Sequence, residues 1–270
     1  DNSLTTNVGN LSGSINVPGS FSTLTGTGGL FDAINQAGLS GDLTVNITAD
    51  ISTETGAVAL NQWAECGVGN YTLTIKPSGA ARTVSGVLNG AALFKFNGAD
   101  RVVIDGNIGG VKSLTLTNTT PTGGITIDLY APSVTNGCNG FTLKNCIIQG
   151  GSVGSGIDFL AEGVDATQGG GPHSNITLRN NLFQKSNQGI LLIGGGPASS
   201  PLSNINVSYN QIGPDDANAG ANSLAITGLW LILSSNVTIH GNLVQNVSGS
   251  VNNNWAYFTK GIGVAGYSTM

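Results

Sequence analysis

Ile176-Thr-Leu-Arg-Asn-Asn181-Leu182 and Val237-Thr-Ile-His-Gly-Asn242-Leu243 are two copies of one pattern. In each copy apolar and polar residues alternate, an Asn-containing turn follows, and an apolar residue restarts the chain. Alternation with a period of two is typical of a β-strand with one buried face. Further copies reach their turns at positions 107, 146 and 210. Recurrence of this kind predicts a repeat architecture.

A second short strand, entered through glycine, lies between successive copies. It reads Gly124-Ile-Thr-Ile127, Gly156-Ile-Asp-Phe159, Gly189-Ile-Leu-Leu192 and Gly261-Ile-Gly-Val264. At least two short strands in each period favour a coil whose turns stack strand on strand. A β-sandwich is the competing architecture, but it predicts frequent hairpins and no repeated Asn turn. We therefore predict an all-β fold, a right-handed parallel β-helix.

Asparagine recurs at the turn of this pattern. Side-chain amides stacked one above another can satisfy each other and the turn backbone. We assign this structural role to Asn107, Asn181, Asn210 and Asn242, in preference to ligand binding. The sequons Asn175-Ile-Thr177 and Asn236-Val-Thr238 are expected by chance in a chain rich in Asn and Thr, so they carry little weight as glycan attachment sites.

The N-terminal third differs from the repeats. Gly28–Gly38 has apolar residues at 30, 31, 33, 34 and 37 and a terminal glycine, which predicts a short amphipathic helix. A helix across the open end of a coil protects apolar side chains and strand edges, so we expect an N-terminal helical cap. We divide the chain into an N-terminal segment (1–19), the cap and first strands (20–60) and the coils (61–270).

At the other end, Gly261–Met270 reads as a strand just begun, with no matching cap. We expect further coils beyond residue 270 in the natural chain, or a partner subunit that stacks end to end on the exposed coil.

Composition restricts the partners of the protein. The chain has 42 Gly, 39% hydrophobic and 9% charged residues, which is unlike a disordered chain. Its net charge of −5 argues against binding to nucleic acid or to an anionic membrane, because both are bound through clustered Lys and Arg. No stretch approaches the ~20 apolar residues of a membrane span, so we expect no membrane insertion.

The three cysteines, Cys66, Cys138 and Cys146, show neither metal-binding spacing nor a Cys-x-x-Cys pair. We expect small buried side chains inside the coil, with a bridge between Cys138 and Cys146 as the alternative.

A family resemblance rests on the first coils. The run from Phe21-Ser-Thr-Leu through Phe31-Asp-Ala-Ile-Asn and Leu39-Ser-Gly-Asp-Leu-Thr-Val-Asn-Ile to Thr74-Ile-Lys-Pro resembles the N-terminal part of β-helical surface proteins of Bacteroidetes. The resemblance covers about residues 20 to 110. It implies a pectate-lyase-type β-helix that is secreted by the type IX system or displayed at the cell surface. The resembling segment contains no catalytic residue, so the resemblance does not imply an activity.

Four titratable residues form the best local group for catalysis: Asp158, Glu162, Asp165 and His173. Asp158 alternates with Ile157 and Phe159, so we expect it to face outward, where a groove can form. The resemblance to β-helical hydrolases would require Asn-Thr-Asp, Asp-Asp, Gly-His-Gly and Arg-Ile-Lys motifs, and that full set is not found.

Two further groups suggest ligands. Asp215, Asp216 and Asn218 offer the oxygen ligands that Ca²⁺ prefers, although turn chemistry alone also explains this loop. Trp230, Trp255 and Tyr257 lie outside the aliphatic pattern, and sugars stack on exposed aromatic rings. Apart from calcium, we expect no cofactor.

The sequence favours a non-catalytic extracellular surface or fibre module, adhesive or structural, that contacts glycans or neighbouring subunits. The alternative is a polysaccharide lyase or glycoside hydrolase that acts in a groove on the β-helix. Outward carboxylates converging with a basic residue across two or three coils would favour the enzyme.

Overall fold

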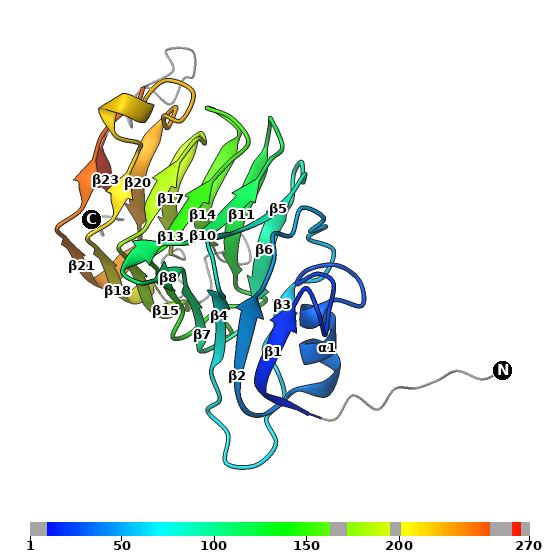
Figure 1. Ribbon diagram of the computed structural model, residues 1–270. Helices are drawn as coiled ribbons and strands as arrows, with labels where there is room; N and C mark the ends of the chain where they lie inside the picture. The colour runs from blue at the N-terminus through cyan, green and yellow to red at the C-terminus, as the bar shows by residue number, and fades with distance from the viewer. Residues whose placement is uncertain (1–9, 163–171, 195–200, 249–260, 266–270) are drawn as a thin grey trace.

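The computed structural model describes residues 10–162, 172–194, 201–248 and 261–265. Short parallel strands stack into three sheets, as Figure 1 shows. Sheet A contains β1 (Leu11–Val17), β2 (Leu39–Ile47), β4 (Leu73–Pro77), β7 (Val102–Asp105), β12 (Thr142–Lys144), β15 (Ser174–Arg179), β18 (Leu202–Ser208) and β21 (Ser234–His240). Sheet B contains β5 (Arg82–Gly86), β10 (Leu114–Asn118), β13 (Cys146–Gln149), β16 (Leu182–Gln184), β19 (Gln211–Ile212) and β22 (Leu243–Val244). Sheet C contains β3 (Leu60–Asn61), β6 (Ala92–Asn97), β11 (Gly124–Tyr130), β14 (Gly156–Glu162), β17 (Gln188–Ile193), β20 (Thr227–Ile232) and β23 (Ile262–Ala265).

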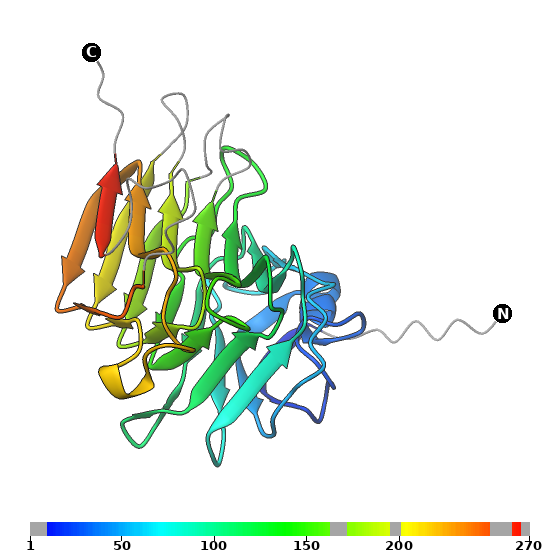
Figure 2. The same cartoon turned by 90° about the horizontal axis from the view of Figure 1, so that it is seen from above.

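From β4 onward the chain visits sheets A, B and C in the same order on each coil, whereas β1 is followed by α1 and β2 passes directly to β3 of sheet C. From β15 it passes to β16 and β17, and each of these strands pairs in parallel with its counterpart one coil later. Figure 2 shows the later strands lying side by side along the axis. This arrangement confirms an all-β parallel solenoid of about seven turns. The right-handed sense stays a prediction, favoured by the usual handedness of parallel crossovers.

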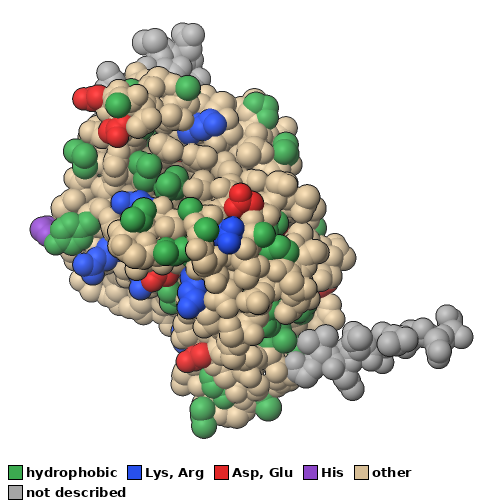
Figure 3. Space-filling model, in the orientation of Figure 1, with side chains coloured by type: hydrophobic (Ala, Val, Ile, Leu, Met, Phe, Trp, Pro, Cys, Tyr) green, Lys and Arg blue, Asp and Glu red, His purple; other side chains and the backbone are tan. Residues whose placement is uncertain are grey.

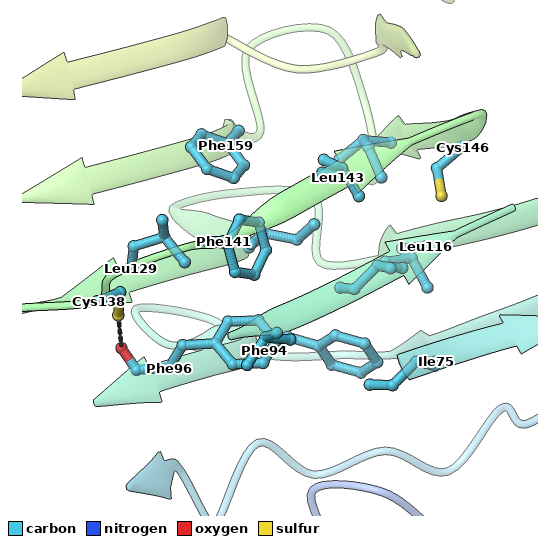
Figure 4. Packing of buried hydrophobic residues seen from close by; sticks show 14 of the residues in the cluster. Ile75, Phe94, Phe96, Leu116, Leu129, Cys138, Phe141, Leu143, Cys146 and Phe159 are labelled. Atoms are coloured by element: carbon cyan, nitrogen blue, oxygen red, sulfur yellow. Dashed lines mark hydrogen bonds between the residues drawn. The ribbon is translucent and has the colours of Figure 1, made fainter. Parts of the chain in front are cut away.

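The interior is filled by the alternate side chains of all three sheets. Phe94, Phe96, Phe141 and Phe159 are fully buried and lie in successive coils or on neighbouring sheets (Figure 4). The ring centroids of Phe96 and Phe141 are 5.1 Å apart, and those of Phe141 and Phe159 are 5.9 Å apart. Contacts at this spacing between tilted rings are favourable. One continuous apolar core therefore runs along the solenoid.

Helix α1 (Leu30–Ala37) lies where the sequence predicts a helix. Its apolar residues face the core; Leu30, Phe31, Ala33 and Ile34 are buried. The helix ends at Gly38, which has φ 72° and donates its N–H to the carbonyl of Ile34 at 2.8 Å. Strand β1 already pairs with β2, so regular strand pairing begins at residue 11. That α1 serves as a cap for the open coil stays a prediction.

All three cysteines are free, so the alternative of a bridge between Cys138 and Cys146 is wrong. Both of these side chains are buried, and burial raises the pKa of each thiol. Cys138 Sγ lies 3.3 Å from the carbonyl of Phe96, to which it donates (Figure 4). Cys66 is exposed.

Candidate functional site

An inner asparagine ladder joins successive coils at the turn from sheet A to sheet B. Asn181 Oδ1 accepts from Cys146 N at 3.0 Å, Asn210 Oδ1 accepts from Asn181 N at 2.9 Å, and Asn242 Oδ1 accepts from Asn210 N at 2.9 Å. Each Asn Nδ2 also donates to a backbone carbonyl of sheet A. These amides hold the turn backbone together and are not available to a ligand.

Asn107 lies outside this ladder, contrary to its assignment from the sequence. It begins a short antiparallel hairpin of β8 (Asn107–Ile108) and β9 (Val111–Lys112), which interrupts the coil after β7. Its exposed side chain accepts from Gly110 N at 2.9 Å. The inserted hairpin moves the next sheet B strand to Leu114, which pairs with Cys146. The repeat pattern alone does not reveal such an insertion.

An outer asparagine ladder runs along the first residues of β15, β18 and β21 in sheet A and continues to Asn139, just before β12; sequence reasoning missed it. Asn175 Nδ2 donates to Asn139 Oδ1 at 2.6 Å, Asn204 Nδ2 to Asn175 Oδ1 at 3.1 Å, and Asn236 Nδ2 to Asn204 Oδ1 at 2.5 Å. The last three have φ between 49° and 55°, which Asn tolerates well. The signal in the sequence is an Asn directly before the first apolar residue of the strand. Two of these residues belong to the sequons, and their amides already have partners.

The outer face of sheet A carries polar side chains in two registered columns. The first column is Thr44, Thr74, Val103, Thr142, Thr177, Asn206 and Thr238. The second column is Asp105, Lys144, Arg179, Ser208 and His240. Because neighbouring strands lie about 4.8 Å apart, each column is a regular row of side chains along the solenoid axis. Val103 interrupts the first column with an apolar side chain, and Ser208 in the second column is buried.

A surface hollow of about 500 Å³ opens at the edge of this face. It is lined by Lys144, Asn145, Arg179, Asn180 and Tyr209. Asn145, Asn180 and Tyr209 have φ between 54° and 58°, so they turn the chain out of sheet A at equivalent points of three coils. Figure 3 shows Lys and Arg side chains close together over the region where Figure 1 labels β7, β15 and β18.

The side chains of the hollow hold each other in place. Lys144 Nζ lies 3.1 Å from Asp105 Oδ2, and the Arg179 guanidinium lies 5.5 Å from the ring centroid of Tyr209. The Tyr209 hydroxyl is 3.0 Å from His240 Nε2. A cation beside an aromatic face is attracted to it, so the Arg179 side chain has a defined orientation although it is exposed.

A second group of charged side chains lies on the outer face of sheet C. Lys95, Asp128 and Glu162 belong to three successive strands, and Lys95 Nζ lies 3.9 Å from Asp128 Oδ2 and 3.7 Å from the ring centroid of Tyr130. Burial raises the pKa of Asp128 to about 7, although Lys95 opposes this shift. Asp128 Oδ1 is buried and accepts no hydrogen bond from the described residues. Sequence reasoning named Glu162 but missed Lys95 and Asp128.

Asp158 is fully buried, so the prediction that it faces outward into a groove is wrong. Four consecutive residues from Asp158 to Ala161 are buried, because both faces of β14 are covered here. Polar groups near its carboxyl group are the Ser186 side chain and the backbone at Gln184 and Gly150, but neither carboxyl oxygen makes a hydrogen bond within the described residues. Burial holds the pKa of Asp158 well above its usual range. Strand alternation predicts which face of the sheet a side chain lies on, but it does not predict whether other parts of the chain cover that face.

His173 is also buried and links three segments of backbone. Its Nδ1 accepts from Cys138 N at 3.0 Å, so its Nε2 carries the proton and donates to the carbonyl of Glu162 at 2.9 Å. Burial lowers the pKa of His173, which favours this neutral form. These contacts give His173 a structural role.

The candidate calcium ligands Asp215, Asp216 and Asn218 hydrogen-bond to neighbouring groups of the chain. Asp215 Oδ1 accepts from the backbone N and Nδ2 of Asn218 and begins the helical turn η1 (Asp216–Asn218). Asp216 Oδ1 accepts from Asn246 Nδ2. Among the described residues, no group of three or more His, Cys, Asp or Glu side chains has the arrangement of a metal site.

Of the aromatic candidates, Trp230 lies on β20 and is partly buried. Asp165, Trp255 and Tyr257 fall outside the described residues.

The described residues thus define a parallel β-solenoid with an open polar face, a cationic hollow at its edge and a partly covered charged group on another sheet. Comparisons with protein-family models, with curated proteins and with solved structures find no match. The resemblance to Bacteroidetes surface proteins therefore stays a prediction. Within the described part of the chain, no helix has the length and apolar character needed to cross a membrane.

Proposed function

We propose that this protein is a non-catalytic extracellular module, adhesive or structural, that binds glycans on the outer face of sheet A. The observation that carries the proposal is the registered pair of columns, in which Thr hydroxyls stand beside charged side chains on successive coils. Hydroxyl and amide groups at fixed positions suit a ligand rich in hydroxyls. A surface held by stacked strands is already ordered, so binding costs little conformational entropy.

The regular spacing favours a polymer over a small molecule. A chain that lies along the solenoid axis from Thr142 to Thr238 meets a hydroxyl or amide group about every 4.8 Å. Each contact on an open face is weak, because water competes for it, but several contacts on one linked ligand act together. The outer asparagine ladder borders the same face and fixes the positions of its strands.

The test is retention of the protein on a panel of immobilised neutral and acidic polysaccharides. The double variant Thr142→Val and Thr177→Val removes two hydroxyls from adjacent coils while keeping β-branched side chains. We expect it to weaken retention by about tenfold, the loss of two modest hydrogen bonds. The matched control is Thr115→Val, which changes an equivalent partly exposed position on sheet B. Retention on no polysaccharide, or equal losses in both variants, would overturn the proposal.

Polysaccharide cleavage is the second candidate function, and the group of Lys95, Asp128 and Glu162 favours it. A carboxyl group with a pKa of about 7 can accept or donate a proton at neutral pH. The test follows reducing ends and unsaturated products over the same panel. If the protein cleaves a polysaccharide, Asp128→Asn should abolish the activity and the exposed control Asp216→Asn should leave it unchanged.

A further inference from the structure

We infer that the hollow beside Arg179 binds the acid group of an anionic glycan, a carboxylate or a sulfate attached to a sugar ring. This inference rests on the proposed function and names the ligand class for it.

The first observation is an unbalanced charge. Lys144 and Arg179 lie directly opposite each other on neighbouring strands, an arrangement of like charges that destabilises a sheet. Asp105 balances Lys144 from the preceding coil at 3.1 Å. Arg179 takes part in none of the ion pairs among the described residues. An anion bound at Arg179, beside Lys144, would balance the remaining positive charge and reduce the repulsion between the two cations.

The second observation is the orientation of Arg179. Its guanidinium stands against the ring of Tyr209, and the hydroxyl of that ring contacts His240. The planar guanidinium presents N–H groups in a fork that matches two oxygens of a carboxylate or sulfate. A side chain held in this way loses less freedom on binding than a freely rotating lysine would lose.

The third observation distinguishes a sugar from a bare anion. Asn145 Nδ2 donates to Asp105 Oδ1 at 2.7 Å, and Asn180 Nδ2 donates to Asn145 Oδ1 at 2.8 Å. This chain of bonds leaves Asn180 Oδ1 without a donor among the described residues, as an acceptor for a hydroxyl group beside the two cations. An acid group on a hydroxylated ring uses both features, whereas inorganic sulfate uses only the cations.

The net charge of −5 opposes the approach of an acidic polymer over long distances. At physiological ionic strength this repulsion is screened beyond about 8 Å, so the local group of Arg179, Lys144 and Asp105, which carries one excess positive charge, decides the outcome. Binding should therefore depend on the two side chains of the hollow and not on the overall charge of the protein.

The test uses three polymers with one backbone: dextran, carboxymethyl-dextran and dextran sulfate. We expect wild-type protein to bind at least one charged polymer about tenfold or more tightly than dextran, and Arg179→Gln to remove that preference. The charge-matched control is Lys112→Gln in the hairpin, which removes one positive charge outside the hollow. It should bind like the wild type, and the two charged polymers separate a carboxylate from a sulfate.

The outcomes separate this inference from the proposed function. Equal binding to all three polymers, binding to none of them, or an Arg179→Gln variant that keeps its preference would each overturn the inference. In each of those cases, retention of the wild type on the polysaccharide panel with sensitivity to the threonine substitutions would leave the proposed function standing. If the wild-type protein is retained on no polysaccharide of the panel, both the proposed function and this inference are overturned.

Discussion

Asn210 Oδ1 accepts two hydrogen bonds from Asn181 in the preceding coil, one from the backbone N at 2.9 Å and one from Nδ2 at 3.0 Å. Both residues are almost completely buried. Asn210 Nδ2 in turn donates to the carbonyl of Leu178 at 2.8 Å. A single side chain thus satisfies backbone groups of the earlier coil at a turn that water does not reach.

Replacement of Asn210 by Ala should strongly destabilise the solenoid. It leaves the N–H of Asn181 and the carbonyl of Leu178 buried without these partners, at a cost of about 1–3 kcal/mol for each group. We expect the free energy of unfolding, measured by urea denaturation, to fall by about 3 kcal/mol. Asn89→Ala, the same substitution at an exposed turn, should change it by less than about 0.5 kcal/mol. Similar losses for the two variants would show that the ladder is not a special source of stability.

Glu54 is a second buried anchor, which the sequence analysis did not identify. Its carboxylate accepts from Leu24 N and Thr25 N, both at 2.7 Å, and from Thr25 Oγ1. Glu54→Gln replaces one accepting oxygen by an NH₂ group, which cannot accept the hydrogen bonds that Leu24 and Thr25 donate. We therefore expect the free energy of unfolding to fall by about 2 kcal/mol. Hydrogen exchange should become faster at Leu24 and Thr25 in particular. Unchanged exchange at these two amides would contradict the assignment.

Asp128 should make stability depend on pH. Its pKa of about 7 in the folded protein lies above the ordinary value of 3.8, so the folded state binds more protons between these values. Stability from this group is therefore present at pH 4 and is lost as pH rises to 7. Asp128→Asn should match the wild type near pH 4 and exceed its stability at pH 8 by on the order of 3 kcal/mol. A variant that is less stable at pH 8 would contradict this account of the sheet C group.

His173 should also make stability depend on pH, with stability lost as pH falls rather than as it rises. Burial lowers its pKa in the folded protein, so the unfolded chain binds the additional proton as pH falls below about 6.5. Protonation of Nδ1 would also break the bond from Cys138 N. We expect the stability difference between the wild type and His173→Gln to shrink as pH falls from 7.5 to 5. A constant difference across this range would show that His173 is not held neutral.

The repeated strands were predictable from sequence because buried and exposed residues alternate within them. Ile176 with Leu178, and Ile205 with Val207, line the core as expected. The ladder position of Asn181 was predictable for the same reason, since it follows a strand in each copy. Asn107 was not, because an inserted hairpin that begins at this residue looks the same in the sequence as the turn of a repeat.

The candidate sites were harder to predict, because they depend on contacts between coils. Asp158 occupies an outward position by alternation, yet it is fully buried beside Ser186 and the backbone of Gln184 and Gly150. Lys95 and Asp128 are far apart in sequence and adjacent only because β6 and β11 pair in this register. Lys144 and Arg179 are adjacent for the same reason on sheet A. Sequence spacing does not reveal these pairs until the length of each coil is known.

One combined measurement tests most directly whether the outer face of sheet A binds glycans without cleaving them. Wild-type protein is incubated with each immobilised polysaccharide at pH 7, and protein retention, reducing ends and unsaturated products are measured on the same sample over time. The account predicts retention that soluble polymer competes away and that the sheet A variants weaken, with no products above the protein-free blank. Product release that increases with time, or no retention on any polysaccharide, would contradict it.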